Sequence, residues 1–359
     1  MSARAAADKP GMGSDAQRRQ SLKRSVLEAL CRAADLALTP LTLVSAMWLK
    51  FLRRVGTQRT PFARRVFQVI GMFPIRDHYY EPFVAPSRLR RSLRQVRPLG
   101  GLDLDVPRQL ALLERFDFEK ELLAVPLEDS GTREFYYNNP AFGSGDAEFL
   151  YSVIRHFRPR RVLEIGSGFS TLLAARAIRR NREDDPRYAC EHTCVEPYEM
   201  PWLESLGVRV IRERVECLGH DVAEALEEND ILFIDSSHVI RPQGDVLFEY
   251  LELLPRLKRG VLIHVHDIFT PRDLPDEWIS ERVRFWNEQY LLEAFLSHNS
   301  EFRVLAALNH LKHDHFETLA RKCPILRRQP EREPGSFWMV RDGRSGTVGA
   351  GGNGERRAA

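Results

Sequence analysis

The feature that most constrains the fold of this chain is the segment Val162–Thr171 (VLEIGSGFST). Its apolar residues enclose an acid, Glu164, and are followed by two glycines one residue apart and by a Ser-Thr pair. This order is typical of a buried parallel strand, a tight turn and a helix N-terminus, which together bind nucleotide-like ligands. We therefore expect this turn to lie against a bound cofactor, in particular through Glu164, Gly166, Ser167, Gly168 and Ser170.

The position of Glu164 bears on the charge of that cofactor. Dinucleotide sites usually read G-x-G-x-x-G, and their glycines lie against a pyrophosphate. Here Thr171 stands where the third glycine would be, and Glu164 precedes Gly166 by two residues. A carboxylate at this place repels phosphate but suits a cofactor that carries an ammonium and a sulfonium group. The E-x-G-x-G pattern resembles motif I of the class I S-adenosylmethionine-dependent methyltransferases, and this resemblance implies S-adenosyl-L-methionine as the cofactor.

Strand and helix signals alternate along the C-terminal two thirds of the chain, which predicts an α/β fold with a doubly wound, mostly parallel sheet. The resemblance covers residues 140–341 and implies the seven-stranded, Rossmann-like methyltransferase fold. We expect strands at 161–165, 191–196, 208–212, 230–235, 260–266, 302–308 and 336–341, the last two as an antiparallel edge hairpin. The expected parts of the chain are a disordered basic tail (1–20), a helical or irregular basic extension (21–108), a methyltransferase domain (109–341) and a disordered Gly-rich tail (342–359).

A second acid, Glu196, ends the strand that follows the glycine turn. A carboxylate there is placed to accept hydrogen bonds from both hydroxyls of a ribose, although a solvated acid at a strand end is the alternative. Upstream, the segment Phe142–Glu148 (FGSGDAE) opens a helix, for which Asp146 is a candidate N-cap. This segment resembles that of catechol O-methyltransferase-like enzymes, which implies contacts to the methionine end of the cofactor from Gly143, Ser144 and Asp146.

The fourth expected strand runs into the sequence IDSSH, which contains Asp235 and His238. Parallel sheets carry their active sites at the carboxyl ends of the strands, so we expect both residues at the mouth of the cofactor site. The catechol-type resemblance implies that Asp235 binds a divalent metal and that His238 replaces the lysine of that family. An imidazole can take a hydroxyl proton at neutral pH, so we expect His238 to act as general base, the alternative being a loop histidine without a role.

The fifth expected strand, Gly260–Ile268 (GVLIHVHDI), carries the remaining candidates. The resemblance implies that Asp267 is the second metal ligand. The family usually has asparagine at the next position, where this chain has Ile268, so the familiar magnesium site is incomplete. If His266 takes the vacant place, the metal preference shifts from magnesium toward manganese, iron or zinc. Alternatively no metal binds, and His238 or His266 performs acid–base catalysis unaided.

The N-terminal part of the chain is strongly basic. Residues 1–100 contain 19 Lys or Arg against 6 Asp or Glu, whereas the whole chain has a net charge of only +3. Such asymmetry indicates an anionic partner, and a membrane surface or a nucleic acid are the candidates. No nucleic-acid motif stands out, so we expect no nucleic acid as partner.

A helical pattern runs from Ser25 to Val55, and we expect it to break at Pro40. The apolar run 36–49 within it is shorter than the ~20 residues of a membrane-spanning helix. Residues 36–54 are therefore expected either to lie in a bilayer interface or to dock on a protein surface, such as that of a second copy in a homo-oligomer.

The cysteines and the motifs indicate the cellular compartment and the reaction of the protein. Five scattered cysteines without a secretory signal favour a reducing compartment, so we expect a cytoplasmic protein, peripheral at the inner membrane face if residues 36–54 bind lipid. The resemblance implies methyl transfer to an oxygen of a small-molecule or glycan acceptor. A non-catalytic cofactor-binding protein and an oxygenase on the same fold are the alternatives. A nicotinamide enzyme is disfavoured by Glu164 and by the missing third glycine.

Overall fold

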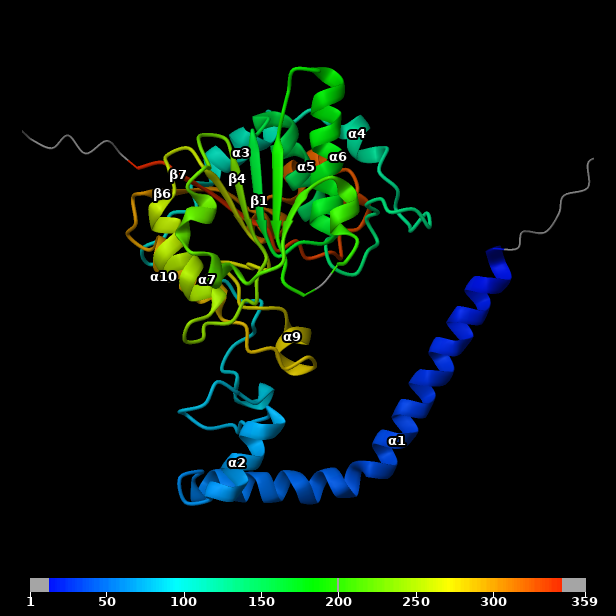
Figure 1. The fold of residues 1–359 in the computed structure, drawn as a ribbon, viewed down its shortest axis with the longest axis vertical. Helices are drawn as coiled ribbons and strands as arrows, with labels where there is room; N and C mark the ends of the chain where they lie inside the picture. Colours follow the sequence, from blue (N-terminus) through cyan, green and yellow to red (C-terminus); the bar gives the residue numbers. More distant parts are fainter. Residues whose placement is uncertain (1–12, 199, 344–359) are drawn as a thin grey trace, which may run out of the picture. The chain divides into compact units, whose positions relative to one another are not determined.

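The computed structural model describes residues 13–198 and 200–343, which belong to two compact units that meet at Arg88 and Leu89 in the sequence (Figure 1). The C-terminal unit begins at Leu89, earlier than the expected boundary at residue 109. The added segment is held by hydrogen bonds from the Arg97 amide to the Pro271 carbonyl (2.9 Å) and from the Asp273 amide to the Leu93 carbonyl (2.9 Å). These bonds make it part of the C-terminal unit.

The C-terminal unit is built on a seven-stranded sheet with the order β3-β2-β1-β4-β5-β7-β6. Strands β1 to β5 pair in parallel, and β7 pairs antiparallel with both β5 and β6. This confirms the predicted fold class and the antiparallel hairpin. The strands are β1 (Arg161–Ile165), β2 (Glu191–Val195), β3 (Arg209–Ile211), β4 (Ile231–Ile234), β5 (Leu262–Val265), β6 (Phe302–Ala307) and β7 (Phe337–Arg341).

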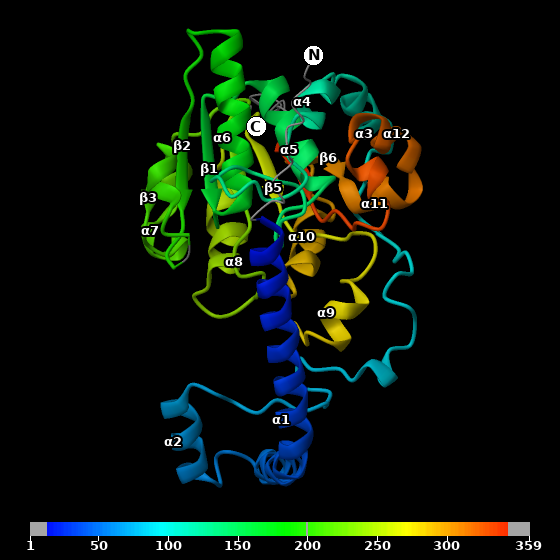
Figure 2. The ribbon, with the colours of Figure 1, turned by 90° about the vertical axis from the view of Figure 1, so that its right-hand side faces the viewer.

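Helices cover both faces of this sheet, and Figure 1 shows α6 and α10 on opposite sides of it. Successive side chains of a strand point to opposite faces, so Phe233 joins the core beneath α5 and α6 while Ile234 joins the core on the side of α10. At the β6 edge lie α3, α11 and α12 (Figure 2). The helices are α3 (Val106–Glu114), α4 (Glu119–Leu123), α5 (Asp146–Phe157), α6 (Phe169–Asp184), α7 (Val215–Leu218), α8 (Asp245–Phe248), α9 (Asp276–Ser280), α10 (Glu288–Leu296), α11 (Leu308–Asp314) and α12 (Phe316–Lys322).

The N-terminal unit consists of a long helix, α1 (Gly13–Val55), a short helix, α2 (Pro61–Ile70), and a 3-10 turn at Pro86–Arg88. Helix α1 continues through Pro40, where the sequence predicted a break, and it bends along its length (Figure 1). A proline within a helix removes one backbone hydrogen bond and causes a kink rather than an obligatory end. The segment Ser25–Val55 is long and apolar enough to cross a membrane by length and composition alone.

The two predicted tails fall mostly outside the described residues. Residues 1–12 and 344–359 are not described, so the expected disorder there stays a prediction. Residues from Gly13 onward are already helical, which corrects the expected end of the N-terminal tail at residue 20.

Candidate active site

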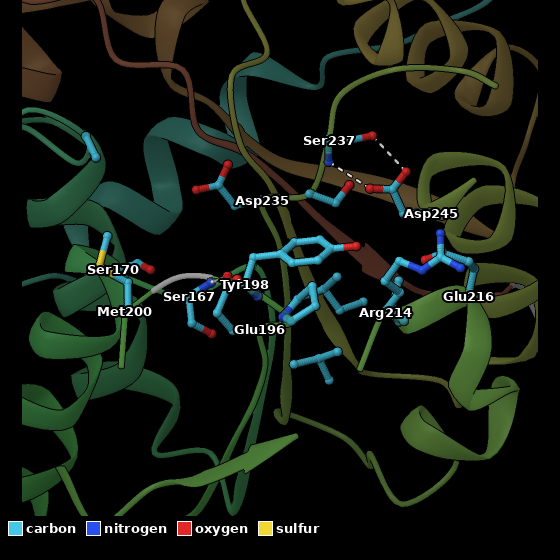
Figure 3. Close-up of a pocket in the computed structure, with 18 of the residues that line it drawn as sticks. Ser167, Ser170, Glu196, Tyr198, Met200, Arg214, Glu216, Asp235, Ser237 and Asp245 are labelled. Carbon is cyan, nitrogen blue, oxygen red and sulfur yellow. Dashed lines mark hydrogen bonds and ion pairs between the residues drawn. The ribbon is translucent and has the colours of Figure 1, made fainter. Parts of the chain in front are cut away.

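A cavity of about 460 Å³ opens at the C-terminal ends of β1, β2 and β4 (Figure 3). Its walls come from the turn 165–170, from the segment 195–198 and from the loop 235–237. Both its size and its place at the carboxyl ends of parallel strands are typical of a small-ligand site. The predicted cofactor residues that line it are Gly166, Ser167, Gly168, Ser170, Glu196 and Asp235.

Gly166 sets the shape of the turn. Its φ is +80°, and a Cβ added there would lie 1.9 Å from the carbonyl oxygen of Asp235. On either side, the Gly166 amide donates to the Val195 carbonyl (3.0 Å) and the Asp235 amide donates to the Ile165 carbonyl (2.8 Å). These contacts hold the ends of β1, β2 and β4 together, and only glycine fits between them.

Glu164 is not among the residues that line the cavity, and its expected contact with the cofactor stays a prediction. Its side chain is fully buried and accepts a hydrogen bond from the Thr171 hydroxyl. The same hydroxyl oxygen accepts a hydrogen bond from the Gly168 amide (3.1 Å). Glu164 therefore holds the glycine turn to the start of α6 through Thr171 without lining the cavity. We expect any influence of Glu164 on a bound cofactor to act through the position of this turn.

Glu196 reaches the cavity from the end of β2. Its carboxylate accepts hydrogen bonds from the backbone amides of Ser167 (3.2 Å) and Tyr198 (3.1 Å). In Figure 3 the Tyr198 side chain lies across the cavity between Asp235 and Arg214. The carboxylate is thus held between the glycine turn and the next loop, where the sequence analysis expected a ribose to bind.

Several lining residues were not predicted, because they come from loops whose positions depend on the tertiary fold. They are Tyr198, Met200, Arg214, Glu216, Ser237, Arg241 and Asp245. Among the described lining residues, four carboxylates stand against two arginines. Asp245 is fixed by the amide (2.9 Å) and the hydroxyl (2.7 Å) of Ser237 (Figure 3). The excess of acids favours a ligand with positive charge over one with a pyrophosphate.

The upstream candidates Gly143, Ser144 and Asp146 are not among the cavity-lining residues. Asp146 is the first residue of α5 rather than its N-cap. Its buried carboxylate accepts hydrogen bonds from the backbone amides of Gly335 (3.2 Å) and Ser336 (2.7 Å). Asp146 thus ties the start of α5 to the segment that leads into β7, and its expected contact with the cofactor stays a prediction.

Next to the cavity, Asp235, His238 and Asp267 bring three possible metal-donor atoms within 4.8 Å of one another. His238 Nε2 lies 3.2 Å from Asp235 Oδ1 and 3.6 Å from Asp267 Oδ2. The group forms because β4 and β5 are parallel neighbours whose C-terminal ends meet. His238 (φ +60°) and Asp267 (φ +58°) both adopt the left-handed conformation, which is uncommon outside glycine and concentrates at functional sites.

Glu288, at the start of α10, completes this group but is not among the predicted site residues. Its buried carboxylate lies 2.8 Å from His238 Nδ1 and accepts a hydrogen bond from the Tyr250 hydroxyl (3.1 Å). The Trp286 ring lies 4.3 Å from the His238 ring. Fifty positions separate Glu288 from His238, so no local sequence pattern links them.

The carboxylates change the protonation of His238. Burial alone lowers the pKa of an imidazole, but hydrogen bonds to Asp235 and Glu288 and the charge of Asp267 raise the pKa of His238 well above its ordinary value. Burial works against the charge of Asp235 as well, yet the neighbouring histidines lower the pKa of Asp235 to about 2. His238 therefore carries a proton at neutral pH in this arrangement, whereas the sequence analysis expected a neutral base.

His266 is not part of the group of mutually close donor atoms. Its Nε2 lies 3.6 Å from Asp267 Oδ1, and its ring packs against Phe142. Burial opposes its charge, but the surrounding carboxylates, Asp267 first among them, raise the pKa of His266. Ile268 is buried in the core. His238, and not His266, is the imidazole that lies close to both carboxylates, and His266 as a third ligand stays a prediction.

A second group of possible donors, Glu164, His192 and Cys194, lies inside the sheet core. Burial, followed by the charge of Glu164, raises the pKa of Cys194. A metal there would have to displace the thiol proton, which burial and the charge of Glu164 hold in place.

Residues 163–268 match the family model described as a methyltransferase domain. An uncharacterized protein of Archaeoglobus fulgidus is 29% identical over 167 residues, which make up 43% of this chain and 74% of that protein.

Two crystal forms of the MycE methyltransferase from the mycinamycin biosynthetic pathway, in complex with Mg and SAH, show 17% identity and TM-scores of 0.29 and 0.28. The aligned part covers 53% of this chain and about half of those chains, 48% and 46%. The family match spans the glycine turn, Asp235 and Asp267. Over residues 163–268, the chain is therefore similar to the methyltransferase domain family.

Proposed function

We propose that the protein transfers the methyl group of S-adenosylmethionine to a hydroxyl oxygen of a small-molecule or glycan acceptor, with a divalent metal held by Asp235, His238 and Asp267. One observation carries this proposal: Asp235 belongs both to the lining of the cavity and to the three-donor group. A cofactor in the cavity and an acceptor at the donor group would therefore be neighbours. Methyl transfer requires this proximity, because the acceptor oxygen must lie in line with the departing sulfonium.

The cavity fits the proposed cofactor on three counts. Backbone at the glycine turn approaches the cavity closely, since Gly166 and Gly168 have no side chains there. The carboxylate of Glu196, held by two backbone amides, is placed for the ribose hydroxyls. The excess of carboxylates in the lining suits the ammonium and sulfonium groups of S-adenosylmethionine.

The donor group fits a divalent metal in its chemistry. Two carboxylates and one imidazole are common ligands of manganese, iron and zinc, and carboxylates also bind magnesium. The Glu288 carboxylate lies 2.8 Å from Nδ1 of His238, the ring nitrogen that does not face Asp235 and Asp267. A carboxylate outside the metal site orients a metal-binding histidine in the same way. A bound metal would act as a Lewis acid that lowers the pKa of the acceptor hydroxyl.

Whether His238 can remove the proton of the acceptor hydroxyl depends on its own protonation state. With Asp235, Asp267 and Glu288 all ionised around it, His238 holds a proton and donates hydrogen bonds. It becomes neutral only when the charge of these neighbours is compensated, and its Nε2 can then bind the metal or, if no metal is bound, take a hydroxyl proton, but not both. Before that, its task is to keep the carboxylates in position.

Calorimetric titration tests the cofactor, and we expect binding of S-adenosylmethionine and S-adenosylhomocysteine but not of NAD. The variant Asp267→Asn should weaken Mn²⁺ binding at least about tenfold, since it loses a charged ligand. It should leave S-adenosylhomocysteine affinity nearly unchanged, because Asp267 does not line the cavity. Asp103→Asn, on the exposed surface, is the matched control.

Activity is measured as release of S-adenosylhomocysteine in the presence of hydroxyl acceptors. Unchanged Mn²⁺ binding by Asp267→Asn would show that the donor group is not a metal site. NAD binding without S-adenosylmethionine binding would refute the cofactor assignment. Bound iron together with oxidation of the acceptor and no methyl transfer would replace this proposal by an oxygenase.

A further inference from the structure

The N-terminal unit presents apolar side chains that its described residues leave uncovered. Only 6% of the most apolar window of α1 is buried. Leu41 is 64% exposed, Met47 65% and Trp48 57%. Contiguous apolar surface of this kind marks a site of interaction with a protein or a membrane.

Both threonine hydroxyls within this stretch of α1 are hydrogen-bonded by the helix itself. The Thr39 hydroxyl donates to the Asp35 carbonyl (2.9 Å), and the Thr42 hydroxyl donates to the Leu38 carbonyl (3.2 Å). A hydroxyl without a partner is costly to place in hydrocarbon. Because these two have partners, they do not prevent the segment from entering a lipid phase.

Helix α2 is amphipathic, with its apolar stripe exposed. Phe62, Val66, Val69 and Ile70 follow the i, i+4, i+7, i+8 spacing of one helix face and are 87%, 51%, 72% and 67% exposed. The cations Arg64 and Arg65 lie outside this stripe by the same spacing. An apolar face opposite a basic face is the pattern of helices that lie in a membrane interface.

From the end of α1 to the middle of α2 the sequence carries only cations. Residues 50–65 contain six Lys or Arg and no Asp or Glu. Arg53 is paired with Glu81 and lies 4.6 Å from the centre of the Phe73 ring, which ties the end of α1 to the following loop. A second copy of this chain would bring the same cations to the interface, since a symmetric dimer apposes identical surfaces. An anionic surface avoids that repulsion.

We propose that the N-terminal unit binds the surface of an anionic lipid bilayer, with the apolar side chains of α1 and α2 among the acyl chains and the cations at the headgroups. Although Ser25–Val55 as a whole is long enough to cross a membrane, its uncharged run Leu36–Leu49 has a length of about 21 Å as a helix, which falls short of the ~30 Å hydrocarbon core. It is bounded by Asp35 and Lys50. The run therefore enters the bilayer from one side, and Trp48 lies near the interface, where tryptophan is enriched.

Vesicle flotation of the full chain tests this proposal. We expect binding to vesicles of phosphatidylcholine with phosphatidylglycerol, weaker binding to phosphatidylcholine alone, and a loss of binding as salt is raised. The double variant Arg64→Gln, Arg65→Gln should bind anionic vesicles roughly 30-fold more weakly, at about fivefold per cation. Val69→Asp should weaken binding to both kinds of vesicle at least about tenfold, because it places a charge in the apolar stripe.

Two matched controls lie in the C-terminal unit. Arg187→Gln removes a cation whose side chain is 93% exposed, and Leu251→Asp places a charge at a residue that is 61% exposed. Both should bind vesicles as the unaltered chain does, and circular dichroism should show the same helix content for all variants.

Three outcomes would overturn the proposal. The first is an unaltered chain that does not float with anionic vesicles. A second is equal binding to both vesicle types that resists salt and alkaline carbonate, which would indicate a spanning anchor. Dimer formation in analytical ultracentrifugation without vesicle binding, lost in Val69→Asp, would assign the apolar stripe to self-association.

Discussion

Gly166→Ala is the substitution whose effect the structure specifies best. The residue needs a φ of +80°, and the added methyl carbon would lie 1.9 Å from the Asp235 carbonyl oxygen, where real Cβ contacts essentially never fall below 3.0 Å. The left-handed conformation costs a non-glycine residue about 1–2 kcal/mol. Relief of the overlap must move β1 and β4 apart by about an ångström, which strains the two backbone hydrogen bonds beside the turn.

Each of those bonds contributes about 1 kcal/mol, so the total loss of unfolding free energy is about 3–4 kcal/mol. For a domain of this size that corresponds to a fall in Tm of about 10 °C. Gly207→Ala is the control for backbone conformation alone: its φ is +72°, and nothing lies within 4 Å of an added Cβ. We expect it to lose only about 1–2 kcal/mol.

Urea denaturation followed by circular dichroism measures both variants, and titration with S-adenosylhomocysteine reports on the cavity. Gly166→Ala should bind this ligand at least about tenfold more weakly, because displacement of the turn moves the cavity wall. If Gly166→Ala and Gly207→Ala were equally destabilised, the close approach of β1 and β4 at this turn would not be what requires glycine.

Glu288→Gln should lower the pKa of His238 toward its ordinary value, as followed by NMR of the imidazole, because a negative charge 2.8 Å away is lost. The raised pKa of His238 stabilises the fold fully below about pH 6.5 and ceases to do so as the pH rises through the folded-state pKa, so this variant should also flatten the fall in stability with pH. Asp146→Asn should lose about 1–2 kcal/mol of unfolding free energy but change S-adenosylhomocysteine affinity less than about threefold, and a large loss of affinity would support Asp146 as a cofactor ligand. Glu148→Gln should lose about 2–3 kcal/mol in urea denaturation, since one amide oxygen cannot replace two carboxylate oxygens that accept three backbone amides, and an unchanged midpoint would contradict this.

The predicted strands and the observed strands agree because their signals are local. The run that contains Ile231–Ile234 is apolar throughout and is buried on both faces, as expected of a central parallel strand. The break expected at Pro40 is wrong because a proline changes only one turn of a helix. The local sequence does not say whether the helix resumes beyond that turn.

The same distinction between local sequence and tertiary structure applies to the residues of the candidate site. The turn at Gly166 and the strand-end acids Glu196 and Asp235 line the cavity as expected, because strand ends and glycine turns are encoded within a few residues. The direction in which a side chain points is not encoded within those few residues. Glu164 precedes the turn by two residues, yet its carboxylate points to Thr171 and does not line the cavity.

The sequence by itself determined the succession of strands and helices along the chain, the glycine turn, and the basic, apolar character of the N-terminal part. All of these depend on composition and spacing along the chain. Only the tertiary structure decided that His238 lies between Asp235, Asp267 and Glu288. These carboxylates lie just after β4, just after β5 and at the start of α10, and the protonation of the imidazole depends on their charges through space. Electrostatic interactions act over a few ångströms whatever the separation in sequence, and therefore the chemistry of this site follows from the fold.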